Sequence, residues 1–467
     1  MEIKDLKGKL IAVLGYGIEG KATTAYLLSH GVRPVLFDHR PWSDWAMQDQ
    51  EHIKSLGVNF IFGPDCLKEL VGFEVAFRSP GIPYLHPDIQ SRISGQKSQL
   101  TVTSQTKWFF DNCPCKIIGI TGTKGKGTTS TLLYEMLRAG EHMAKGTIYL
   151  TGNIGETQPL DFLDTLKTTD RVVYEMSSFQ LQDLRKSPHV AVVLMTTQEH
   201  LDHHATVDEY HDAKANIAKH QNTDDVCIYN SDYSASVKIG RQSKGVQYQI
   251  SRSSKVTNGC YAEAGAIVAH LKNGDYRLET KYLQLRGQHN LENICAAVCA
   301  ALSLHVHEED VQKILNNFTG LRYRLQFIGK FSEVNFYNDS FSTTPETAIA
   351  AIQSFTEPEI LILGGSSKNS DFSELGKIVA QAKNIKSILL IGQESERIKE
   401  SIMNAGGFFG KFLEGATTMA SIFDQIRAVA ETGDVVLLSP GCASFGMFKN
   451  YKDRGEQFTY FAQNFSR

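Results

Sequence analysis

Short apolar runs rich in Val, Ile and Leu recur along the chain, and each ends abruptly in glycine, proline or polar residues. Such runs are typical of strands that are buried on both faces of a parallel sheet. We therefore predict strands at LIAVLGYG (10–17), VLFD (35–38), KIIGITG (116–122), VVYEMSS (172–178), VAVVLMTT (190–197), ILILGG (360–365), SILLIG (387–392) and VVLLSPG (435–441).

Longer stretches with apolar residues at helical spacing lie between these runs, for example at 128–138, 290–302 and 344–355. Strands that alternate with helices predict the α/β class with mainly parallel sheets. Ligands of such sheets bind beyond the carboxyl ends of the strands. We therefore expect the catalytic and ligand-binding residues at those ends.

A length of 467 residues exceeds one ordinary domain and predicts about three. Residues 1–98 open with a strand, a glycine turn and a helix, which predicts a Rossmann-like domain. Residues 99–320 predict a central domain with a mainly parallel sheet, and the short alternating segments at 226–285 add a small β-rich part. Residues 321–467 carry their own strand–helix repeats and predict a second Rossmann-like domain.

Composition narrows the class of protein. Hydrophobic residues make up 42% and charged residues 21%, and the net charge of -3 gives no basic excess for nucleic-acid binding. The N-terminus MEIKDLKGKL lacks the apolar segment of a secretory signal, and no apolar run approaches the ~18–20 residues of a membrane helix. The eight cysteines form no CxxC pair, so we expect buried free thiols. We expect a cytoplasmic protein without membrane insertion.

A glycine fingerprint follows the first predicted strand. Gly15, Gly17 and Gly20 have the spacing GxGxxG, and Asp38 ends the next strand. Glycines there let the backbone approach a phosphate at a helix N-terminus, where free N–H groups and the helix dipole favour anions. Read alone, the fingerprint fits a dinucleotide site of a dehydrogenase, and it also fits glycines that serve only close packing of a helix on a strand.

A second glycine-rich segment, TGTKGKGTT at 121–129, is the stronger signal. It follows the apolar strand KIIGI and precedes a helix, which is the context of a phosphate-binding loop. Backbone amides would cradle the phosphates, and Lys126 would neutralise their charge. The position after the lysine, where Ser or Thr usually ligates magnesium, is Gly127, and the first hydroxyl appears at Thr128.

Carboxylates and imidazoles follow two other predicted strands. Glu175 closes one strand and precedes Ser177, and the segment EHLDHH at 199–204 follows another. Such side chains at adjacent strand ends could hold a divalent cation beside a nucleotide. Glu175 and His200 are therefore candidate metal ligands.

Together these segments resemble the Mur ligase family, and in particular its glutamate-adding members, along nearly the whole chain. The resemblance rests on TGTKGKGTTS (121–130), GNIG (152–155), EMSSFQL (175–181), EHLDHH (199–204), DAKANI (212–217), GQHNLEN (287–293), LRYRLQ (321–326), YNDSFSTTP (337–345) and LSPGCASFGMFKNYKDRGEQF (438–458). The last segment and SSFQL are specific to the glutamate-adding members.

The resemblance implies an enzyme of peptidoglycan precursor synthesis, and hence of cell wall biogenesis. It implies an ATP-dependent ligase that adds D-glutamate to UDP-N-acetylmuramoyl-L-alanine through an acyl-phosphate intermediate. The family usually acts as monomers, with ATP and two magnesium ions. Because the ATP and glutamate sites lie on different domains, closure of the domains is expected to complete the active site.

The roles of individual residues carry over by motif. Lys126, His200 and Lys214 are the expected catalytic residues, and Lys214 matches a lysine that is carbamylated in this family. The expected metal ligands are Thr128, Glu175, His200 and Lys214. The expected ATP contacts are Gly122, Thr123, Lys124, Gly125, Lys126, Gly127, Thr128, Asn293, Arg324 and Asp339.

The two other substrates are assigned in the same way. The expected contacts to the UDP-linked substrate are Ile18, Glu19, Asp38, His39, Arg40, Gly81, Asn153 and Ser177. The expected contacts to glutamate are Thr343, Lys368, Ser444 and Tyr451. The glycine fingerprint is then a uridine-nucleotide site, and the dehydrogenase interpretation falls away.

Three positions depart from the family pattern. Gly127 replaces a hydroxyl residue, Glu199 stands where Asp is usual, and Phe341 stands where the glutamate ligases usually have a lysine that helps to bind glutamate. A phenyl ring cannot pair with a carboxylate. The segment DSFSTTP resembles variant ligases that add L-glutamate and work with a separate epimerase.

Three alternatives stay open at this point. The first is the same reaction with L-glutamate. The second is an inactive nucleotide-binding protein, although a non-catalytic protein has no need of Lys126, Glu175, His200, Lys214 and Asp339 together. The third is a folate polyglutamylating enzyme, which the segment GKG favours and the intact first domain disfavours.

Overall fold

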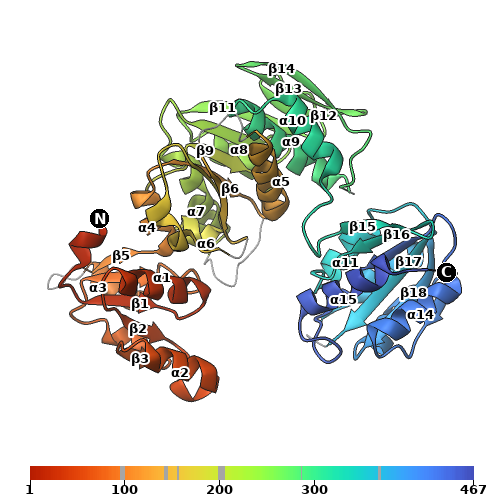
Figure 1. Ribbon diagram of the computed structural model, residues 1–467, viewed down its shortest axis with the longest axis horizontal. Coiled ribbons are helices and arrows are strands. Elements are labelled where there is room, and N and C mark those ends of the chain that lie inside the picture. Colours follow the sequence, from red (N-terminus) through yellow and green to blue (C-terminus); the bar gives the residue numbers. More distant parts are fainter. Residues whose placement is uncertain are drawn as a thin grey trace. The chain divides into compact units, whose positions relative to one another are not determined.

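The structure is a computed structural model that describes residues 1–94, 100–140, 146–154, 157–197, 206–285, 287–366 and 370–466. The chain divides into two compact units (Figure 1). The larger unit comprises Met1–Glu279 and Glu292–Gln312, and the smaller unit comprises Thr280–Leu291 and Lys313–Arg467. No helix of the described residues has both the length and the apolar character that crossing a membrane requires.

The larger unit begins with a five-stranded parallel sheet in the order β3-β2-β1-β4-β5. This order and its helices confirm the predicted Rossmann-like domain. The sheet continues past residue 98, where the sequence placed the domain boundary, because β5 pairs with β4. The elements are β1 (Ile11–Leu14), α1 (Ile18–Ser29), β2 (Val35–Asp38), α2 (Met47–Ser55), β3 (Phe60–Phe62), β4 (Val75–Arg78), α3 (Pro87–Ile93) and β5 (Thr101–Thr103).

A nine-stranded sheet in the order β14-β13-β12-β11-β10-β9-β6-β8-β7 forms the centre of the larger unit. Its strands are parallel from β7 to β12, and β13 is antiparallel to both of its neighbours. The predicted β-rich region is therefore a continuation of the main sheet. The strands are β6 (Lys116–Thr121), β7 (Ile148–Gly152), β8 (Arg171–Glu175), β9 (Val190–Val193), β10 (Val226–Asn230), β11 (Val246–Ser251), β12 (Gly259–Glu263), β13 (Ala266–Leu271) and β14 (Gly274–Glu279).

Helices lie before, between and after these central strands, and the predicted helices at 128–138 and 290–302 are confirmed. The helices are α4 (Gln105–Asn112), α5 (Lys126–Ala139), α6 (Ser178–Leu181), α7 (Val207–Lys219), α8 (Ser234–Gly240), α9 (His289–Ser303) and α10 (Glu308–Asn317). Short 3-10 helices lie at Ile3–Leu6, Trp42–Asp44, Cys66–Glu69, Pro159–Asp161 and Leu163–Thr165.

The smaller unit contains a six-stranded sheet in the order β15-β16-β20-β17-β18-β19, which is parallel except for β15. Its elements are β15 (Gln326–Phe331), β16 (Val334–Asn338), α11 (Pro345–Ile352), β17 (Glu359–Gly365), α12 (Ser373–Gln381), β18 (Ile385–Gly392), α13 (Ser395–Asn404), β19 (Lys411–Leu413), α14 (Met419–Val429), β20 (Val435–Leu438) and α15 (Tyr451–Gln463).

Both faces of this third sheet are buried, as the continuous apolar runs predict. Leu361 and Leu363 pack on the face that α11, α12 and α13 cover, whereas Ile360 and Ile362 pack on the face of α14 and α15. Alternate residues of one strand therefore enter two different cores. This arrangement confirms the second Rossmann-like domain.

All eight cysteines are buried and free, as expected. The Sγ atoms of Cys113 and Cys115 lie 3.5 Å apart. Cys113 follows the end of α4, and Cys115 comes just before β6.

A buried carboxyl group opens β17. Glu359 is 0% exposed, and neither of its carboxyl oxygens has a hydrogen-bond partner among the described residues. Burial, with the nearby charge of Glu357, raises the pKa of Glu359 from its ordinary value of 4.5 to about 8. The unfolded chain therefore loses this proton at a lower pH than the folded chain does, and folding becomes less favourable as pH rises from about 4.5 to about 8.

We expect Glu359→Gln to remove this dependence and to raise the free energy of unfolding by about 2–3 kcal/mol at pH 7. Urea unfolding of both proteins at several pH values between about pH 5 and pH 8 measures the difference. Glu346→Gln, at an exposed position of the same unit, is the matched control. An equal pH dependence in the wild type and in Glu359→Gln would contradict the assignment.

Candidate functional site

The predicted phosphate loop lies between β6 and α5, as the sequence indicates. Gly125 is the N-cap of α5 and has a φ of 87°, a left-handed conformation that favours glycine. A Cβ atom at Gly125 would lie 2.1 Å from Oδ1 of Asn293. The loop therefore needs a glycine at this position, and Asn293 lies directly against it. The N–H groups in the first turn of α5 provide a site for an anion.

Lys126 folds back onto this loop. Its Nζ donates hydrogen bonds to the carbonyl oxygens of Gly122 and Thr123, both at 3.0 Å. The loop is also bonded to the segment after β9, because Thr123 N–H donates to the carbonyl of Met195 at 2.7 Å. The ammonium group is thus held within the loop, where phosphate oxygens would meet it. Gly127 and Thr128 lie half-buried in the first turn of α5, and Lys124 is exposed.

Glu175 lies at the carboxyl end of β8, beside the loop. It pairs in register with Ile120 of β6 and is 5% exposed. The backbone N–H of Asn153, which follows β7, donates to the carbonyl of Glu175 at 3.0 Å. The carboxyl ends of β6, β7 and β8 therefore bring together the phosphate loop, Glu175 and Asn153.

Lys214 reaches the same place from α7. Its side chain is buried, and Nζ donates to the carbonyl oxygen of Gly122 at 2.9 Å and to Oγ1 of Thr121 at 3.2 Å. Nζ also lies 4.8 Å from the ring centroid of Tyr210. The Gly122 carbonyl therefore accepts hydrogen bonds from two lysines, Lys126 and Lys214. Two cations on one acceptor repel each other unless an anion is also present, which suits this end of the sheet to phosphate binding.

The predicted magnesium ligands are only partly described. His200 and the glutamate-site residue Lys368 lie outside the described residues. Within the described residues no group of three or more His, Cys, Asp and Glu side chains is arranged to hold a metal. Thr128 and Glu175 supply hydroxyl and carboxylate oxygens, the hard donors that magnesium prefers, and a carbamate on Lys214 would add a second carboxylate. The chemistry of these donors, and not a ready-made cluster among the described residues, is what fits magnesium.

The glycine fingerprint at β1 and α1 serves close packing and leaves a free helix N-terminus. A Cβ at Gly20 would lie 1.9 Å from the carbonyl oxygen of Gly15, which in turn accepts a hydrogen bond from Ser79 Oγ at 2.9 Å. Ile18, the first residue of α1, is 76% exposed. The helix N-terminus is therefore available to an anion, with an apolar side chain beside it. Gly81 is exposed as well.

Asp38, at the end of β2, organises the neighbouring loop. Its Oδ2 accepts from Tyr16 N–H at 2.8 Å, and its Oδ1 accepts from the backbone N–H and Nε of Arg40 at 3.0 and 3.1 Å. Burial alone would raise the pKa of Asp38, but the hydrogen bonds from Arg40 and Tyr16 outweigh it and lower this pKa below its ordinary value. The guanidinium of Arg40 also lies 3.5 Å from the ring centroid of Trp45. Arg40 is thus held at the strand end, and His39 is exposed beside it.

Glu19 has a different environment from the one that its predicted role suggests. Its Oε1 accepts from Nε2 of Gln180 at 2.8 Å, and its Oε2 is buried. Burial raises the pKa of Glu19 to about 7 although the bond from Gln180 opposes the rise. The side chain therefore faces α6, whose N-cap is Ser177.

Arg78 and Asp183 form a buried polar contact that the sequence analysis did not identify. The guanidinium of Arg78 donates to the carbonyls of Ile82 at 2.7 Å and Phe179 at 3.1 Å, and it lies 3.5 Å from Oδ2 of Asp183. The one sequence feature that could have indicated this contact is the position of Arg78, a charged residue directly after the apolar run VAF. Arg78 joins the first sheet to the segment that carries Ser177 and Gln180.

In the smaller unit, Asp339 fixes the turn that carries Arg324. Asp339 follows β16 and is buried, and its carboxylate accepts from Leu325 N–H at 2.9 Å and from Ser439 Oγ at 2.7 Å. Burial raises the pKa of Asp339 to about 7, although these hydrogen bonds and the charge of Arg324 oppose the rise. Arg324 itself is exposed. Two predicted ATP contacts thus lie in adjacent loops, one before β15 and one after β16.

The predicted glutamate contacts that the structure describes lie in the loops after β16 and β20 and at the start of α15. Thr343 and Tyr451 are half-buried, and Ser444 is buried. Arg454 braces this region. Its guanidinium is fully buried and donates to Oγ and the carbonyl of Ser340 at 3.0 and 2.8 Å and to the carbonyl of Cys442 at 3.3 Å. Arg454 was not predicted as a site residue, although it lies within the KDRGEQF segment.

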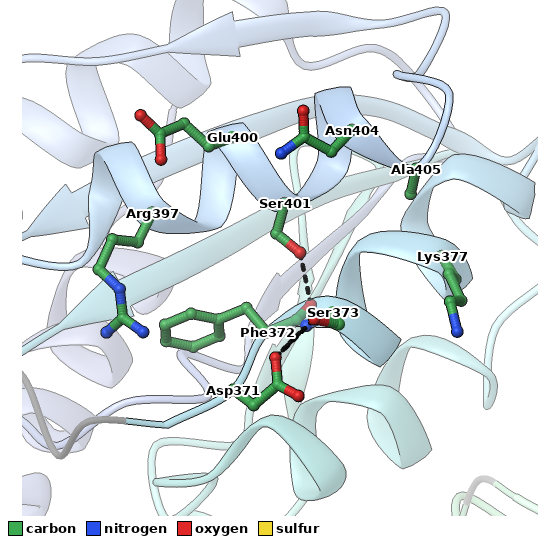
Figure 2. A pocket seen from close by; sticks show the side chains of 9 residues that line it. All are labelled: Asp371, Phe372, Ser373, Lys377, Arg397, Glu400, Ser401, Asn404 and Ala405. Carbon is green, nitrogen blue, oxygen red and sulfur yellow. Dashed lines mark hydrogen bonds between the residues drawn. The ribbon is translucent and has the colours of Figure 1, made fainter.

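A separate pocket of about 330 Å³ lies between α12 and α13 (Figure 2). Arg397 Nη1 donates to Glu394 Oε2 at 2.6 Å, and Ser401 Oγ donates to the carbonyl of Phe372 at 2.7 Å. None of the described predicted site residues lines this pocket. Its lining carries charges of both signs and comprises Asp371, Phe372, Ser373, Lys377, Arg397, Glu400, Ser401, Asn404 and Ala405.

The sequence matches known protein families and relatives along most of its length. Residues 120–301 match the model of the Mur ligase middle domain, and residues 323–442 match that of the Mur ligase glutamate ligase domain. The chain is 33% identical over 468 residues to a UDP-N-acetylmuramoylalanine–D-glutamate ligase of Ruminiclostridium cellulolyticum, covering 99% of this chain and 98% of the relative.

Solved structures show the same fold at low sequence identity. A crystal structure of MurF from Acinetobacter baumannii matches with a TM-score of 0.58 and 17% identity, covering 100% of this chain and 93% of that one. The MurF ligase of Thermotoga maritima in complex with ADP matches with a TM-score of 0.55 and 17% identity, covering 99% and 96%.

Proposed function

The chain belongs to the Mur ligase family, and we propose that it is an ATP-dependent ligase that joins D-glutamate to UDP-N-acetylmuramoyl-L-alanine. The name of the relative that matches along the whole chain supports this substrate pair. The role would be a step of peptidoglycan precursor synthesis, carried out in the cytoplasm by a monomer.

The observation that carries the proposal is the pair of lysines at the phosphate loop. Lys126 and Lys214 donate to the same carbonyl oxygen, that of Gly122, and Glu175 ends the adjacent strand. A phosphate loop alone would suit many nucleotide-binding proteins. A second, buried lysine from α7 at the same carbonyl adds a group that would bind a metal ion once it is carbamylated, and such an ion neutralises a phosphoryl group during transfer.

The proposed reaction has two chemical steps. A carboxylate oxygen of the precursor attacks the γ-phosphorus of ATP, the bond from phosphorus to the bridging oxygen breaks, and ADP leaves. The glutamate amine then attacks the acyl carbon of the acyl phosphate, loses a proton, and inorganic phosphate leaves. The protein's part is to bind, orient and neutralise charge, because phosphoryl transfer needs little covalent chemistry from the protein.

Each group of residues supports one part of this reaction. The N–H groups of residues 122–128 and the ammonium of Lys126 would bind the ATP phosphates, with Asn293, Arg324 and Asp339 as further contacts. Thr128, Glu175, His200 and a carbamylated Lys214 would hold two magnesium ions, which when bound neutralise phosphate charge.

The remaining groups would bind the two acceptor substrates. Ile18, the backbone of Glu19, Gly81 and the segment 38–40 would contact the uridine nucleotide, with Asn153 and Ser177 toward the muramoyl-alanine. The exposed start of α1 and the fixed guanidinium of Arg40 support the placement of its phosphates there. Thr343, Lys368, Ser444 and Tyr451 would bind glutamate.

L-Glutamate is a second candidate for the amino acid, and Phe341 favours it. Phe341 stands in the segment where the resemblance implies a lysine, and its ring contacts both Arg324 and Tyr451. A ring at this position removes one cation from the glutamate site and can change which enantiomer is accepted.

The release of inorganic phosphate tests the proposal. We expect the purified full-length chain to release phosphate when ATP, magnesium, UDP-N-acetylmuramoyl-L-alanine and D-glutamate are all present, and to release little when any of them is omitted. L-Glutamate in a parallel reaction serves as the comparison. Phosphate release with L-glutamate but not with D-glutamate would make L-glutamate the substrate in the proposal. No phosphate release with either amino acid in a folded sample would contradict the proposed ligase activity.

A further inference from the structure

Arg324 lies in a turn with an unusual backbone. The residues on either side of it, Tyr323 and Leu325, have φ values of 64° and 45°. Residues other than glycine rarely adopt this left-handed backbone conformation, and each one that does so costs about 1 kcal/mol or more of folding free energy. Two of them in three positions indicate that the surrounding structure forces the turn, and that the position of Arg324 depends on what holds the turn in place.

The loop after β16 holds this turn at two points. Oδ1 of Asp339 accepts from Leu325 N–H at 2.9 Å, and Phe341 N–H donates to the carbonyl of Tyr323 at 2.9 Å. One residue before Arg324 and one residue after it are thus bonded to the same short loop. This pairing fixes the backbone of Arg324 but leaves its long side chain undirected.

The ring of Phe341 gives that side chain its direction. The guanidinium carbon of Arg324 lies 4.0 Å from the ring centroid of Phe341, well within the range of a cation–π contact. Tyr451 also contacts this ring, and the two rings meet edge to face with centroids 4.9 Å apart. Phe341 is 38% exposed, so the ring is available to solvent and to a ligand as well as to Arg324.

We propose that Phe341 is a positioning residue for Arg324, because its ring holds the guanidinium over the turn that Asp339 and Phe341 fix by their hydrogen bonds. The nucleotide then meets an arginine whose side chain is already ordered, and less conformational entropy is lost on binding. The role rests on the proposed function, since it takes Arg324 as a contact of ATP.

A competing role for the same ring is a wall of the glutamate site, because Tyr451 is a predicted glutamate contact. The two roles differ in which substrate responds to a change at position 341. Loss of a support for Arg324 weakens the use of ATP, whereas loss of a wall weakens the use of glutamate.

The test compares Phe341→Leu, which removes the aromatic face, with Phe341→Tyr, which keeps it. In protein labelled with 13C-arginine, we expect the δ-methylene protons of Arg324 to lose their upfield ring-current shift in Phe341→Leu and to keep it in Phe341→Tyr. Arg324→Lys identifies the signal. This measurement needs no catalysis, so it decides the position of Arg324 even if the chain proves not to be a glutamate ligase.

The same variants are compared in turnover. We expect kcat/KM for ATP to fall about two- to fivefold in Phe341→Leu through a higher KM, the change that an exposed cation–π contact supports. Phe341→Tyr should restore the wild-type value, and KM for glutamate should not change. An unchanged arginine signal, tighter binding of ATP by Phe341→Leu, or a rise in KM for glutamate alone would overturn the proposal.

Discussion

Lys126→Met should lower phosphate release by about a hundredfold to a thousandfold, the loss expected when one preorganised charge is removed from a transition state. Nζ of Lys126 is held by the carbonyls of Gly122 and Thr123, so the ammonium is in place before substrate arrives. Methionine keeps most of the length of the side chain and removes the charge. Steady-state phosphate release with saturating substrates measures the effect.

The control for this variant is Lys116→Met, which changes an exposed lysine at the opposite end of β6. Thermal unfolding of both variants shows whether the loop still folds, since Lys126 also donates hydrogen bonds to the carbonyls of Gly122 and Thr123. If Lys126→Met keeps more than about a tenth of the wild-type rate while Lys116→Met is unaffected, the loss is smaller than the removal of a charge from the transferring phosphoryl group should cause. That result would contradict the role of Lys126.

Lys214→Ala should lose activity on a similar scale and regain part of it when a short carboxylate such as acetate is added. Nζ of Lys214 is buried at the Gly122 carbonyl beside Thr121, and Lys126 donates to the same carbonyl. A carbamate on Lys214 would replace one of two adjacent cations by an anion, which relieves their repulsion and provides a metal ligand. Acetate can occupy the space that the alanine vacates.

Lys219→Ala, an exposed position at the end of the same helix, is the matched control and should neither lose activity nor respond to acetate. The carbamate can also be observed directly, because wild-type protein exchanged with 13C-bicarbonate should show a carbonyl signal that Lys214→Ala lacks. Full activity of Lys214→Ala without any carboxylate, together with no such signal in the wild type, would exclude carbamylation.

Local pattern predicted the parts of the site that lie within a single strand–turn–helix segment. The apolar run at 116–120, the glycines after it and the helix that follows predicted where Lys126 would lie, and β6 and α5 confirm the elements. Glu175 was predicted at a strand end and closes β8. Buried parallel strands have a continuous apolar signature, so their ends can be located from the sequence alone.

Contacts between distant segments could not be read in the same way. Lys214 was assigned only by the resemblance, because no spacing in the sequence shows that α7 brings its Nζ to Gly122. The strand β5 pairs with β4 of the first sheet although it follows the predicted boundary at residue 98, because a three-residue segment, Thr101–Thr103, carries too little apolar pattern to be recognised. Glu19 was expected at the substrate, and only the structure shows its side chain bonded to Gln180.

The turn around Arg324 shows a further limit. Left-handed positions are usually signalled by glycine or asparagine, but Tyr323 and Leu325 carry no such signal. The conformation follows from hydrogen bonds to Asp339 and Phe341, residues that the sequence analysis considered only for substrate binding. The roles of His200 and Lys368 stay predictions from the resemblance.

The contact between Gly125 and Asn293 bears on protein engineering. Asn293 lies on α9, far along the chain, yet its Oδ1 fills the space where a side chain at residue 125 would begin, and it accepts from Thr129 Oγ1 at 3.4 Å. The conformation of the phosphate loop therefore depends on a residue outside the loop. A graft of residues 121–130 into another sheet would transfer the glycines without the amide that packs against them, so a chimera that exchanges this loop should exchange the start of α9 with it.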